Sequence, residues 1–286
     1  MSTIDFSRFA RDIAAANGSG QMLPVIEKEL LHYEILRSMQ EARLLASLSF
    51  QGGTCLRLCY GALRASEDLD FAGGAGFEAS NLASLKDCIE KTLPERYQVQ
   101  VQVAEPTKLD SLVKKWRIRI DTTPAKADLP SQKITLEVAA IPFYSAEPRM
   151  LQLNYEGLPS SYEDVVVPCE SLEEILADKL ESFICSPRIR HRDIWDLQWL
   201  ARRPGLDLTA AHTLRAKKEV DYGESEAFAQ GLSRATIQLG EIIDSKEFLT
   251  QMLRFLPQDV ISNTVENKDW RIAAQNLIAD LYTCYL

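Results

Sequence analysis

The sequence predicts an α/β fold with a mixed sheet, followed by a helical C-terminal subdomain. Up to residue 168, several short segments place apolar residues at every second position, which is typical of strands. Beyond that point, apolar residues recur at steps of three and four, which is typical of amphipathic helices. The chain has 286 residues and is 46% apolar, so it can bury a sizeable core. We expect an N-terminal segment at residues 1–24, a core domain at 25–168 and the helical subdomain at 169–286.

The predicted core begins with a long amphipathic helix over residues 24–48, a short bridge at 49–51 and a short helix at 54–60. An alternating segment at 67–71 suits a strand, and residues 80–93 suit a crossover helix. Because strands and helices alternate, a mixed sheet with helices beside it is expected. Three further strand candidates are residues 98–103, 114–121 and 133–141.

The helical subdomain is expected to follow a connection at residues 162–168. Ser171 suits the N-cap of its first helix, and Glu174 three residues later completes the pattern of a capping box. Further helical patterns lie at residues 193–202, 224–244, 246–255 and 268–285.

Composition and charge exclude several classes of protein. A net charge of −9 and a pI near 5.0 argue against a surface devoted to nucleic acid, although a local basic groove is compatible with them. No apolar run is long enough to cross a bilayer, and residues 1–20 lack the pattern of a secretory signal. The six cysteines and three histidines are scattered without the spacing of a zinc site, so reduced, mostly buried thiols are expected. We therefore expect a cytoplasmic protein without a membrane partner.

Two adjacent glycines, Gly52 and Gly53, precede the predicted short helix. Such a turn lets backbone N–H groups approach a phosphate closely, with the positive end of the helix behind them and the Thr54 hydroxyl as a further donor. A tight turn with a threonine cap explains most such tripeptides equally well. The turn therefore indicates phosphate binding only in combination with the residues that follow it.

Asp68 and Asp70 follow the turn on a predicted strand. Side chains two residues apart on a strand point to the same face, so the two carboxylates are held side by side. Their repulsion is relieved if a divalent cation lies between them, and oxygen ligands suit Mg²⁺ or Mn²⁺. An isolated pair of this kind is more often a solvated edge strand.

A third carboxylate, Glu137, lies on another predicted strand whose apolar residues face the opposite way. If that strand lies beside the strand of Asp68 and Asp70, the three acids form the ligand set of a two-metal phosphoryl-transfer site. One metal would activate an attacking hydroxyl, and the other would hold a triphosphate and stabilise leaving pyrophosphate. The sequence does not set the order of the strands.

Residues 52–70 resemble the first motif of the nucleotidyltransferase toxins of the AbiEii/AbiGii type, within the polymerase-β-like superfamily. That motif is a glycine-glycine-threonine or serine turn, a helix, and then Arg-x-Ser/Thr-x-Asp-x-Asp, in which Arg64 and Ser66 stand at the matching positions. A helix bearing Lys179 and an Arg-Asp-x-x-Asp-Leu motif at residues 192–197 extend the resemblance. The likeness covers roughly residues 24–200 in motif order.

The resemblance implies a polymerase-β-like nucleotidyltransferase core that uses Mg²⁺ or Mn²⁺ and transfers a nucleoside monophosphate from an NTP to an acceptor hydroxyl. It also implies a bacterial toxin with a cognate antitoxin, and RNA, including tRNA, as an acceptor. It assigns metal binding to Asp68, Asp70 and Glu137, and triphosphate binding to Gly52, Gly53, Thr54, Arg64, Ser66 and Lys179.

Lys179 occupies the apolar stripe of its predicted helix, where an ammonium needs an anion or a route to water. A triphosphate would serve, and extension of the side chain to the surface explains the position about as well. Asp193 and Asp196 lie one helical turn apart, where acidic residues also favour N-caps and first turns. The resemblance gives at least one of them a catalytic role, either positioning Lys179 or acting as a base.

Two basic clusters could hold a polynucleotide backbone, although charge runs are usually solvated faces. One lies on a single face of the predicted strand at residues 114–121, and the other precedes the helix at 193–202. Arg64 also lies close enough to the carboxylate strand to reach a phosphate. The clusters are Lys115, Arg117 and Arg119, and Arg188, Arg190, His191 and Arg192.

Three other functions fit parts of the sequence. A small-molecule nucleotidyltransferase resembling antibiotic-modifying enzymes suits the acidic net charge, because such substrates are cationic. A catalytically silent nucleotide-binding module is opposed by the presence of every expected carboxylate. A glycosyltransferase with an Asp-x-Asp metal motif is opposed by the phosphate turn that precedes the pair. Nucleotide preference, acceptor and oligomeric state are not predicted.

Overall fold

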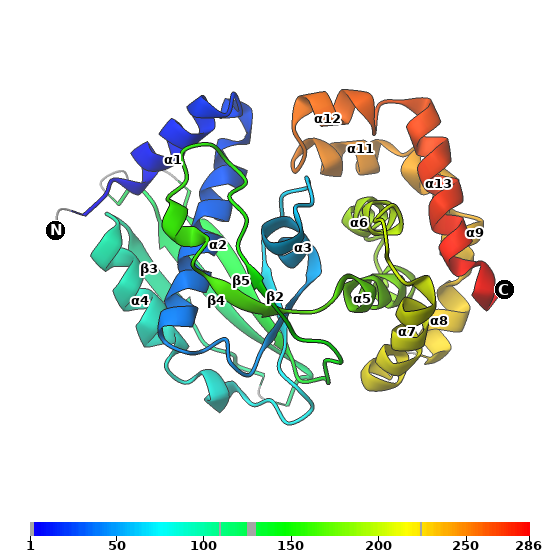
Figure 1. The fold of residues 1–286 in the computed structure, drawn as a ribbon, viewed down its shortest axis with the longest axis horizontal. Coiled ribbons are helices and arrows are strands. Elements are labelled where there is room, and N and C mark those ends of the chain that lie inside the picture. Colours follow the sequence, from blue (N-terminus) through cyan, green and yellow to red (C-terminus); the bar gives the residue numbers. More distant parts are fainter. Residues whose placement is uncertain (1–2, 109, 125–129, 224) are drawn as a thin grey trace. The chain divides into compact units, whose positions relative to one another are not determined.

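In the computed structural model, residues 3–108, 110–124, 130–223 and 225–286 are described. The chain divides into two compact units, Met1–Cys169 and Glu170–Leu286. The first is built on a seven-stranded sheet with helices, and the elements described in the second are helices (Figure 1). Each unit has its own core and is described by itself.

The sheet of the first unit contains every strand that the sequence predicts. The strands at residues 67–71, 98–103, 114–121 and 133–141 are found with their ends shifted by up to two residues. The short bridge before the glycine turn also forms a strand. The strands are β1 (Ser49–Gln51), β2 (Leu69–Ala72), β3 (Gln100–Ala104), β4 (Val113–Asp121), β5 (Gln132–Ala139), β6 (Glu147–Met150) and β7 (Val166–Cys169).

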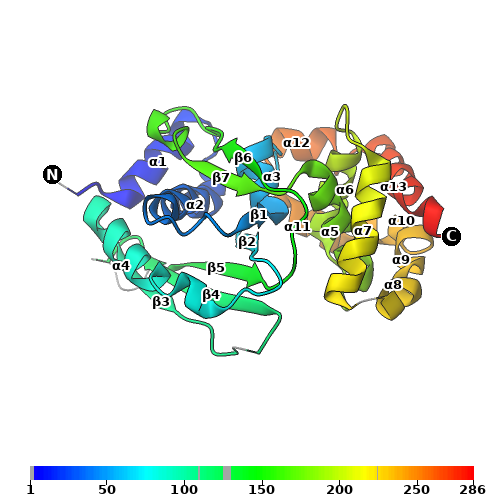
Figure 2. The same ribbon diagram turned by 60° about the horizontal axis from the view of Figure 1, so that its bottom comes forward.

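The strands follow the order β3-β4-β5-β2-β1-β7-β6 across the sheet. Strand β2 is parallel to β5 and antiparallel to β1, while β1 is parallel to β7 (Figure 2). The sheet is therefore mixed, which confirms the predicted fold class. Its order places β2 and β5 side by side, which the sequence left undetermined.

Strands β6 and β7 are not predicted from the sequence. They form an antiparallel pair at one edge of the sheet, with Pro148 opposite Pro168. Proline supplies no N–H to a ladder, so a segment that contains it reads as a connection rather than as a strand. The edge strand β6 accommodates Pro148 because one of its sides needs no partner, and Pro168 lies in β7 next to Cys169, where β7 pairs with β1.

The helices of the first unit differ from the prediction mainly in their ends. The predicted helix at residues 24–48 stops at Glu41, and Arg43 then takes a φ of 59°, a left-handed conformation that does not continue a helix. The predicted helix at 80–93 is a short 3₁₀ turn followed by a regular helix. The helices are α1 (Phe6–Ala16), α2 (Leu23–Glu41), α3 (Gly52–Tyr60) and α4 (Leu85–Arg96), with 3₁₀ turns at Gly20–Met22, Ala79–Leu82 and Ser160–Tyr162.

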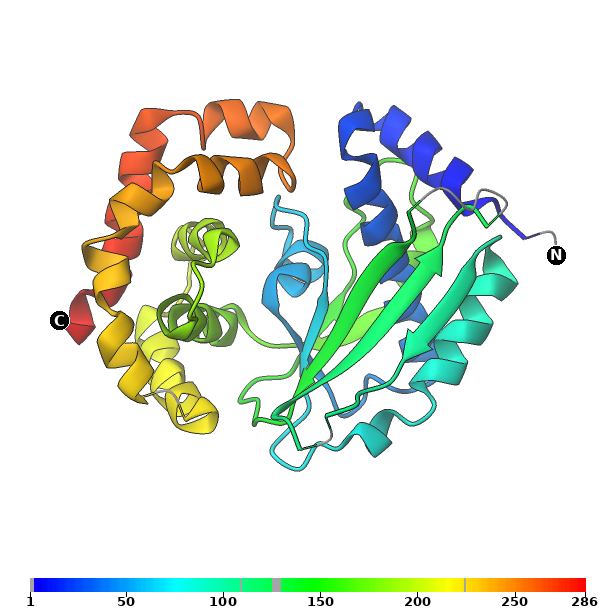
Figure 3. The same cartoon turned by 180° about the vertical axis from the view of Figure 1, so that it is seen from behind.

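Strand β4 has one buried and one exposed face. Trp116, Ile118 and Ile120 are at most 1% exposed, whereas the residues between them are exposed. Seen from behind, β3, β4 and β5 lie in front of α4 and α2 (Figure 3). Burying each of these large apolar side chains stabilises the unit by about 1.5–3 kcal/mol. The polar face of β4 is therefore the face turned away from α4 and α2.

The helices of the second unit include two that the sequence does not predict, α7 and α12. Ser171 caps α5 by accepting a hydrogen bond from the Glu174 N–H at 3.3 Å, as predicted. The predicted helix at 224–244 is three short helices. The helices are α5 (Leu172–Cys185), α6 (His191–Ala201), α7 (Leu208–Tyr222), α8 (Ser225–Gly231), α9 (Ser233–Thr236), α10 (Leu239–Ile243), α11 (Lys246–Leu253), α12 (Gln258–Asn263) and α13 (Lys268–Tyr282), followed by a 3₁₀ turn at Thr283–Tyr285.

The last residue of α8, Gly231, packs closely against the end of α5. A Cβ atom at this position would overlap the carbonyl oxygen of Ile184, so the contact requires glycine. Of the helices in the described part of the chain, none is long and apolar enough to span a membrane.

Candidate active site

The turn between β1 and α3 is shaped by Gly52. Its φ of 76° lies in the left-handed region, which glycine adopts without the steric penalty of a Cβ atom. A Cβ atom here would lie 2.8 Å from Oδ2 of Asp70. The side chain of Gln51 does not cap α3. The Asp70 carboxylate and the N-terminus of α3 therefore lie side by side.

Gly53 leaves room for Arg64. A Cβ atom at Gly53 would overlap the guanidinium of Arg64 and would lie 3.1 Å from Oγ of Ser66. Arg64 is 2% exposed, and its Nη1 donates to the carbonyl oxygen of Ala65 at 2.9 Å. The guanidinium of Arg64 therefore occupies the space beside Gly53, and its contact with a phosphate stays a prediction. Its positive charge lies against the backbone of the turn.

Thr54 connects α3 to the chain just before β2. Its hydroxyl donates a hydrogen bond to the carbonyl oxygen of Asp68, and its side chain is buried. The sequence predicts this hydroxyl as a donor to phosphate, but its single proton is used inside the protein. Thr54 therefore helps to position Asp68 relative to the turn.

Asp68 and Asp70 lie at the start of β2 and are half-buried. Oδ1 of Asp68 accepts a hydrogen bond from the Thr135 N–H at 3.2 Å. Asp70 is paired in register with Gln51 on one side and with Glu137 on the other. Residues in register on neighbouring strands point to the same face. Asp70 and Glu137 therefore share one face of the sheet, and Asp68 lies just before β2.

Glu137 makes an ion pair with its cross-strand neighbour. Nζ of Lys115 lies 2.8 Å from Oε1 of Glu137, and the carboxylate is 29% exposed. Among the described residues, the carboxylate oxygens of Asp68, Asp70 and Glu137 do not all lie within 4.8 Å of one another, whereas the sulfur atoms of three cysteines in this unit do. The ammonium of Lys115 thus neutralises the Glu137 carboxylate, as a bound cation would.

The donor set fits a divalent cation of the hard class. Asp68 and Asp70 offer carboxylate oxygens, which suit Mg²⁺ or Mn²⁺ rather than a soft metal. The lack of a Cβ atom at Gly52 keeps the space beside Oδ2 of Asp70 clear. Glu137 could complete the set if its carboxylate left Lys115.

The exposed face of β4 lies on the same side of the sheet as the carboxylates. Lys115, Arg117 and Arg119 are exposed, as the sequence predicts. Arg119 is in register with Lys133, and Nη2 of Arg119 lies 3.7 Å from Oδ1 of Asp121, an anion that partly offsets the repulsion between the two cations. A surface pocket of about 490 Å³ opens here, lined by Lys28, Arg119, Pro130, Ser131, Gln132 and Lys133.

Lys179 of the helical unit is buried in an ion-pair cluster. Its side chain is 8% exposed, and Nζ lies 2.6 Å from Oδ1 of Asp193 and 2.9 Å from Oδ2 of Asp196. Ser182 and Arg190 also donate hydrogen bonds to Asp193. The two aspartates that the sequence singled out are therefore the partners of Lys179, and the side chain does not extend to the surface.

The charge state of Asp193 follows from these partners. Burial alone would raise its pKa, but the ammonium of Lys179 and the guanidinium of Arg190 outweigh burial and hold the pKa well below its ordinary value. Asp193 is therefore ionised at neutral pH, and its lowered pKa makes it a weak proton acceptor in this arrangement. Its geometry is that of a residue that positions Lys179.

The second basic cluster is partly used within the helical unit. Arg190 pairs with Asp193, and the guanidinium of Arg192 lies over the ring of Phe255 at 5.3 Å. Arg188 is exposed, and His191 is half-buried. This cluster is therefore less available to a polynucleotide than the face of β4.

A buried cluster around Lys218 was missed because α7 was not predicted. The Lys218 side chain is 0% exposed, and its ammonium lies 3.1, 2.8 and 3.3 Å from carboxylate oxygens of Glu170, Glu174 and Asp178. Burial lowers the pKa of Lys218, but the three carboxylates outweigh it and raise the pKa above its ordinary value. The only sequence signal was a lysine within a segment of weak helical pattern.

Three cysteines form a second feature that the sequence did not reveal. The sulfur atoms of Cys55, Cys59 and Cys169 lie within 4.8 Å of one another. All six cysteines are free thiols, and these three are the buried ones. The spacing of Cys55 and Cys59 on one helix was visible in the sequence, but Cys169 is more than a hundred residues away.

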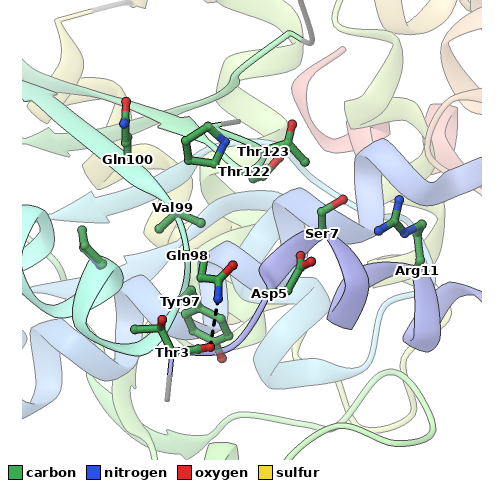
Figure 4. Close-up of a pocket in the computed structure, with 12 residues that line it drawn as sticks. Thr3, Asp5, Ser7, Arg11, Tyr97, Gln98, Val99, Gln100, Thr122 and Thr123 are labelled. Atoms are coloured by element: carbon green, nitrogen blue, oxygen red, sulfur yellow. Dashed lines mark hydrogen bonds between the residues drawn. The ribbon is translucent and has the colours of Figure 1, made fainter. Parts of the chain in front are cut away.

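A further pocket, of about 550 Å³, lies between residues of α1, β3 and the chain after β4 (Figure 4). At one side of it, Nε2 of Gln98 donates to the carbonyl oxygen of Thr3 at 3.4 Å. None of the predicted site residues lines this pocket. The candidate active site therefore rests on the turn and the carboxylates.

Comparisons with known proteins identify a family. The family model of the AbiEii nucleotidyl transferase toxin of type IV toxin–antitoxin systems matches residues 34–281. No curated protein matches the sequence. A provisionally assigned nucleotidyltransferase from H. pylori is similar in structure, with 19% identity, 90% of this chain and 98% of that chain covered, and a TM-score of 0.46. JHP933 from Helicobacter pylori is similar at 19% identity, with 91% and 95% covered and a TM-score of 0.43.

The family match covers most of the chain and includes both units. Every predicted site residue, from Gly52 to Asp196, lies inside the matched range. The match also confirms the resemblance drawn from the two motifs. The chain therefore belongs to the AbiEii nucleotidyl transferase toxin family of type IV toxin–antitoxin systems.

Proposed function

We infer that this protein transfers a nucleoside monophosphate from an NTP to an acceptor hydroxyl, with Mg²⁺ or Mn²⁺ held by Asp68 and Asp70. The main support is the closeness of Asp70 to the turn that starts α3, where a Cβ atom at Gly52 would lie 2.8 Å from the carboxylate. The N–H groups of the turn suit phosphate, and the carboxylates suit a cation. Together they suit a metal-bound triphosphate.

In this reaction the acceptor oxygen attacks the α-phosphorus of the NTP. The bond from that phosphorus to the oxygen bridging the β-phosphate breaks, pyrophosphate leaves, and the acceptor proton passes to solvent. A divalent cation, when bound, would lower the pKa of the acceptor hydroxyl and stabilise the charge on pyrophosphate. Gly52 and Gly53 would bind phosphate oxygens through their N–H groups, and Thr54 would keep Asp68 in position.

Glu137 is proposed to complete the ligand set. In the structure it pairs with Lys115 at 2.8 Å, and the two are in register on neighbouring strands. Ligand binding would require Glu137 to exchange this ion pair for the cation. The released Lys115 would then offer its ammonium to a phosphate on the same face.

We propose RNA, including tRNA, as the acceptor. The exposed cations of β4 lie on the same face of the sheet as Asp70, and Arg119 stands opposite Lys133. These cations would bind the phosphates of a polyanion and place its backbone beside the carboxylates. A small-molecule acceptor is the second candidate, because the net charge of −9 favours a cationic substrate.

Lys179 keeps the proposed role of a triphosphate ligand. Its ion pairs with Asp193 and Asp196 would then give both aspartates a positioning role. A cluster that only stabilises the helical unit would account for the same distances. Lys179→Arg tests this, because it keeps the charge and the ion pairs: a raised KM for NTP with an unchanged unfolding transition supports the ligand role, and an unchanged KM contradicts it.

The partners and location follow from the family and the chemistry. Membership of a type IV toxin–antitoxin family implies an antitoxin partner. We propose that the protein acts in the cytoplasm, where NTPs and RNA are both present.

The decisive assay incubates the purified protein with each α-labelled NTP, Mg²⁺ and total RNA. The test variant is Asp68→Ala/Asp70→Ala, and the matched control is Asp12→Ala/Asp87→Ala, which removes two exposed carboxylates of the same unit. We expect label on RNA with the wild type and the control but not with the test variant. Labelling by the test variant would contradict the proposed site. NTP binding by calorimetry without label on RNA would instead favour a small-molecule acceptor or a silent binding module.

A further inference from the structure

The three buried cysteines of the first unit converge from two separate elements. Cys55 and Cys59 lie one turn apart on α3, so their side chains share a face of that helix. Cys169 ends β7 and is in register with Phe50 of β1, the strand that leads into α3. The three sulfur atoms lie within 4.8 Å of one another, and the residues are 0%, 3% and 0% exposed.

The distances between the sulfur atoms suit a shared metal ion. A tetrahedral Zn²⁺ with bonds of about 2.3 Å to sulfur places its sulfur ligands about 3.8 Å apart. A triangle with sides below 4.8 Å therefore needs only small side-chain shifts to close around such an ion. A disulfide would join two of the sulfurs at about 2.05 Å and exclude the third.

The charges around the triangle also suit a metal thiolate. Three thiolates and one Zn²⁺ carry a net charge of −1, and the guanidinium of Arg149 interacts electrostatically with Cys59 and Cys169. Arg149 is held near by its position over the Tyr60 ring, at 4.7 Å, and by Glu147 at 2.5 Å. A nearby cation stabilises the thiolate, which is the form that binds metals.

We propose that Cys55, Cys59 and Cys169 together bind one thiophilic divalent cation of the Zn²⁺ class, separate from the cation of the carboxylates. The three sulfurs supply three of the four ligands of a tetrahedral site. The ion ties α3 to β7. Because α3 begins at the Gly52 turn, the ion also stiffens the turn that binds phosphate, a consequence that rests on the proposed function.

The test uses the full chain, reduced and freed of metal by a chelator, and titrated with Co²⁺ in the presence of excess Mg²⁺. Thiolate ligands give Co²⁺ a near-ultraviolet charge-transfer band that carboxylate ligands do not give. We expect this band to saturate at one Co²⁺ per chain and to disappear when Zn²⁺ is added. Absence of the band would overturn the proposal when a thiol assay of the same unfolded sample shows that the cysteines are reduced.

Three cysteine variants locate the site. Cys59→Ser should weaken Co²⁺ binding by about 100-fold or more, because loss of even an outer partner of a metal ligand costs 10–100-fold. Cys88→Ser, which changes a half-buried cysteine of the same unit outside the triangle, should bind as the wild type does. Cys284→Ser removes an exposed cysteine close to His212 in the other unit. Loss of the band in this variant instead would overturn the proposal.

A readout on the wild type covers the case in which Cys59→Ser does not fold. The wild-type chain is treated with a thiol reagent with and without Zn²⁺, and the modified cysteines are identified by peptide mass. Zn²⁺ should protect Cys55, Cys59 and Cys169 together while Cys88 and Cys284 react at unchanged rates. Equal rates at the three buried cysteines with and without Zn²⁺ would contradict the site.

Discussion

The acidic residues of the two units are stabilised in opposite ways. In the helical unit, Lys218 is surrounded at 2.8–3.3 Å by three carboxylates and is completely buried. In the α/β unit, Asp68 and Asp70 are half-buried beside the start of a helix, and Asp68 is held by a backbone N–H. The difference separates charges that maintain a fold from charges that are placed to bind a ligand.

Paired substitutions at the two centres should give opposite results. Lys218→Met leaves three carboxylates without their buried partner, so we expect a loss of about 3–5 kcal/mol in the free energy of unfolding. Asp70→Asn keeps the size of a half-buried side chain, so stability should change by less than about 1 kcal/mol. Transfer should fall at least about a thousandfold in this variant, since about 4 kcal/mol of metal-assisted stabilisation is lost.

Urea unfolding and single-turnover transfer assays measure the two effects separately. A Lys218→Met variant of normal stability would mean that the cluster is not structural. An Asp70→Asn variant that unfolds readily would mean that Asp70 belongs to the fold rather than to the ligand site.

The two glycines at the ends of α3 allow a sharper comparison. Gly52 and Gly61 both have a φ of 76°, and a Cβ atom at each would lie 2.8 Å from a side-chain oxygen, of Asp70 and Gln152 respectively. Substitution by alanine should destabilise either variant by about 1–2 kcal/mol, the cost of a left-handed conformation for a residue with a Cβ atom. Only Gly52→Ala should also lose transfer activity, because only Gly52 adjoins a proposed metal ligand.

Thermal unfolding and the labelled-NTP assay, run on both alanine variants, check this prediction. Equal activity in the two variants would remove the Gly52 turn from the site.

The pH dependence of stability gives a smaller effect. The folded pKa of Asp193 lies below its ordinary value, so its ion pairs contribute stability that is complete above the unfolded pKa of about 4. That contribution is lost as the pH falls from about 4 through the folded pKa. The Asp193→Asn variant should therefore lose less stability than the wild type between neutral pH and pH of about 3.

Denaturant unfolding at a series of pH values compares the two proteins. If the free energy of unfolding fell equally in the two proteins at acidic pH, Asp193 would not have a depressed pKa in the folded unit. Glu170 has a raised pKa, so its protonation at acidic pH changes the stability in the opposite direction. The effect of Asp193 is therefore seen only by comparing the variant with the wild type.

The smallest expected effect concerns RNA. If Arg119 contacts a phosphate, Arg119→Ala should weaken RNA binding and reduce the slope of log affinity against log salt by about 1. Arg8→Ala, which changes an exposed arginine of α1, is the matched control. Filter binding over a range of KCl concentrations gives both slopes. Identical slopes for the two variants would remove the β4 face as an RNA contact.

Local patterns predicted much of the α/β unit. The alternation at residues 67–71 placed Asp68 and Asp70 on one face, and alternation along β4 separated its cations from its core. Both signals need only neighbouring residues. The edge strand β6 and its neighbour β7 were missed, because Pro148 and Pro168 suggest a connection rather than a pair of strands.

The rest of the candidate site depends on contacts between distant residues. The sequence did not show that β2 pairs with β5, the pairing that puts Glu137 beside Asp70. The burial of Arg64 beside Gly53 depends on the space left by an absent side chain. The meeting of Cys169 with α3 has no local signal at all. Tertiary packing therefore decides which of the suggestive residues come together.

The most direct test of the central claim is the binding of Mn²⁺ in the presence of a non-hydrolysable NTP, followed by electron paramagnetic resonance. Mn²⁺ has oxygen-ligand preferences like those of Mg²⁺. The wild type and Asp12→Ala/Asp87→Ala should bind Mn²⁺ that Asp68→Ala/Asp70→Ala does not bind. Equal Mn²⁺ binding by all three proteins would contradict the claim that Asp68 and Asp70 hold the metal of the reaction.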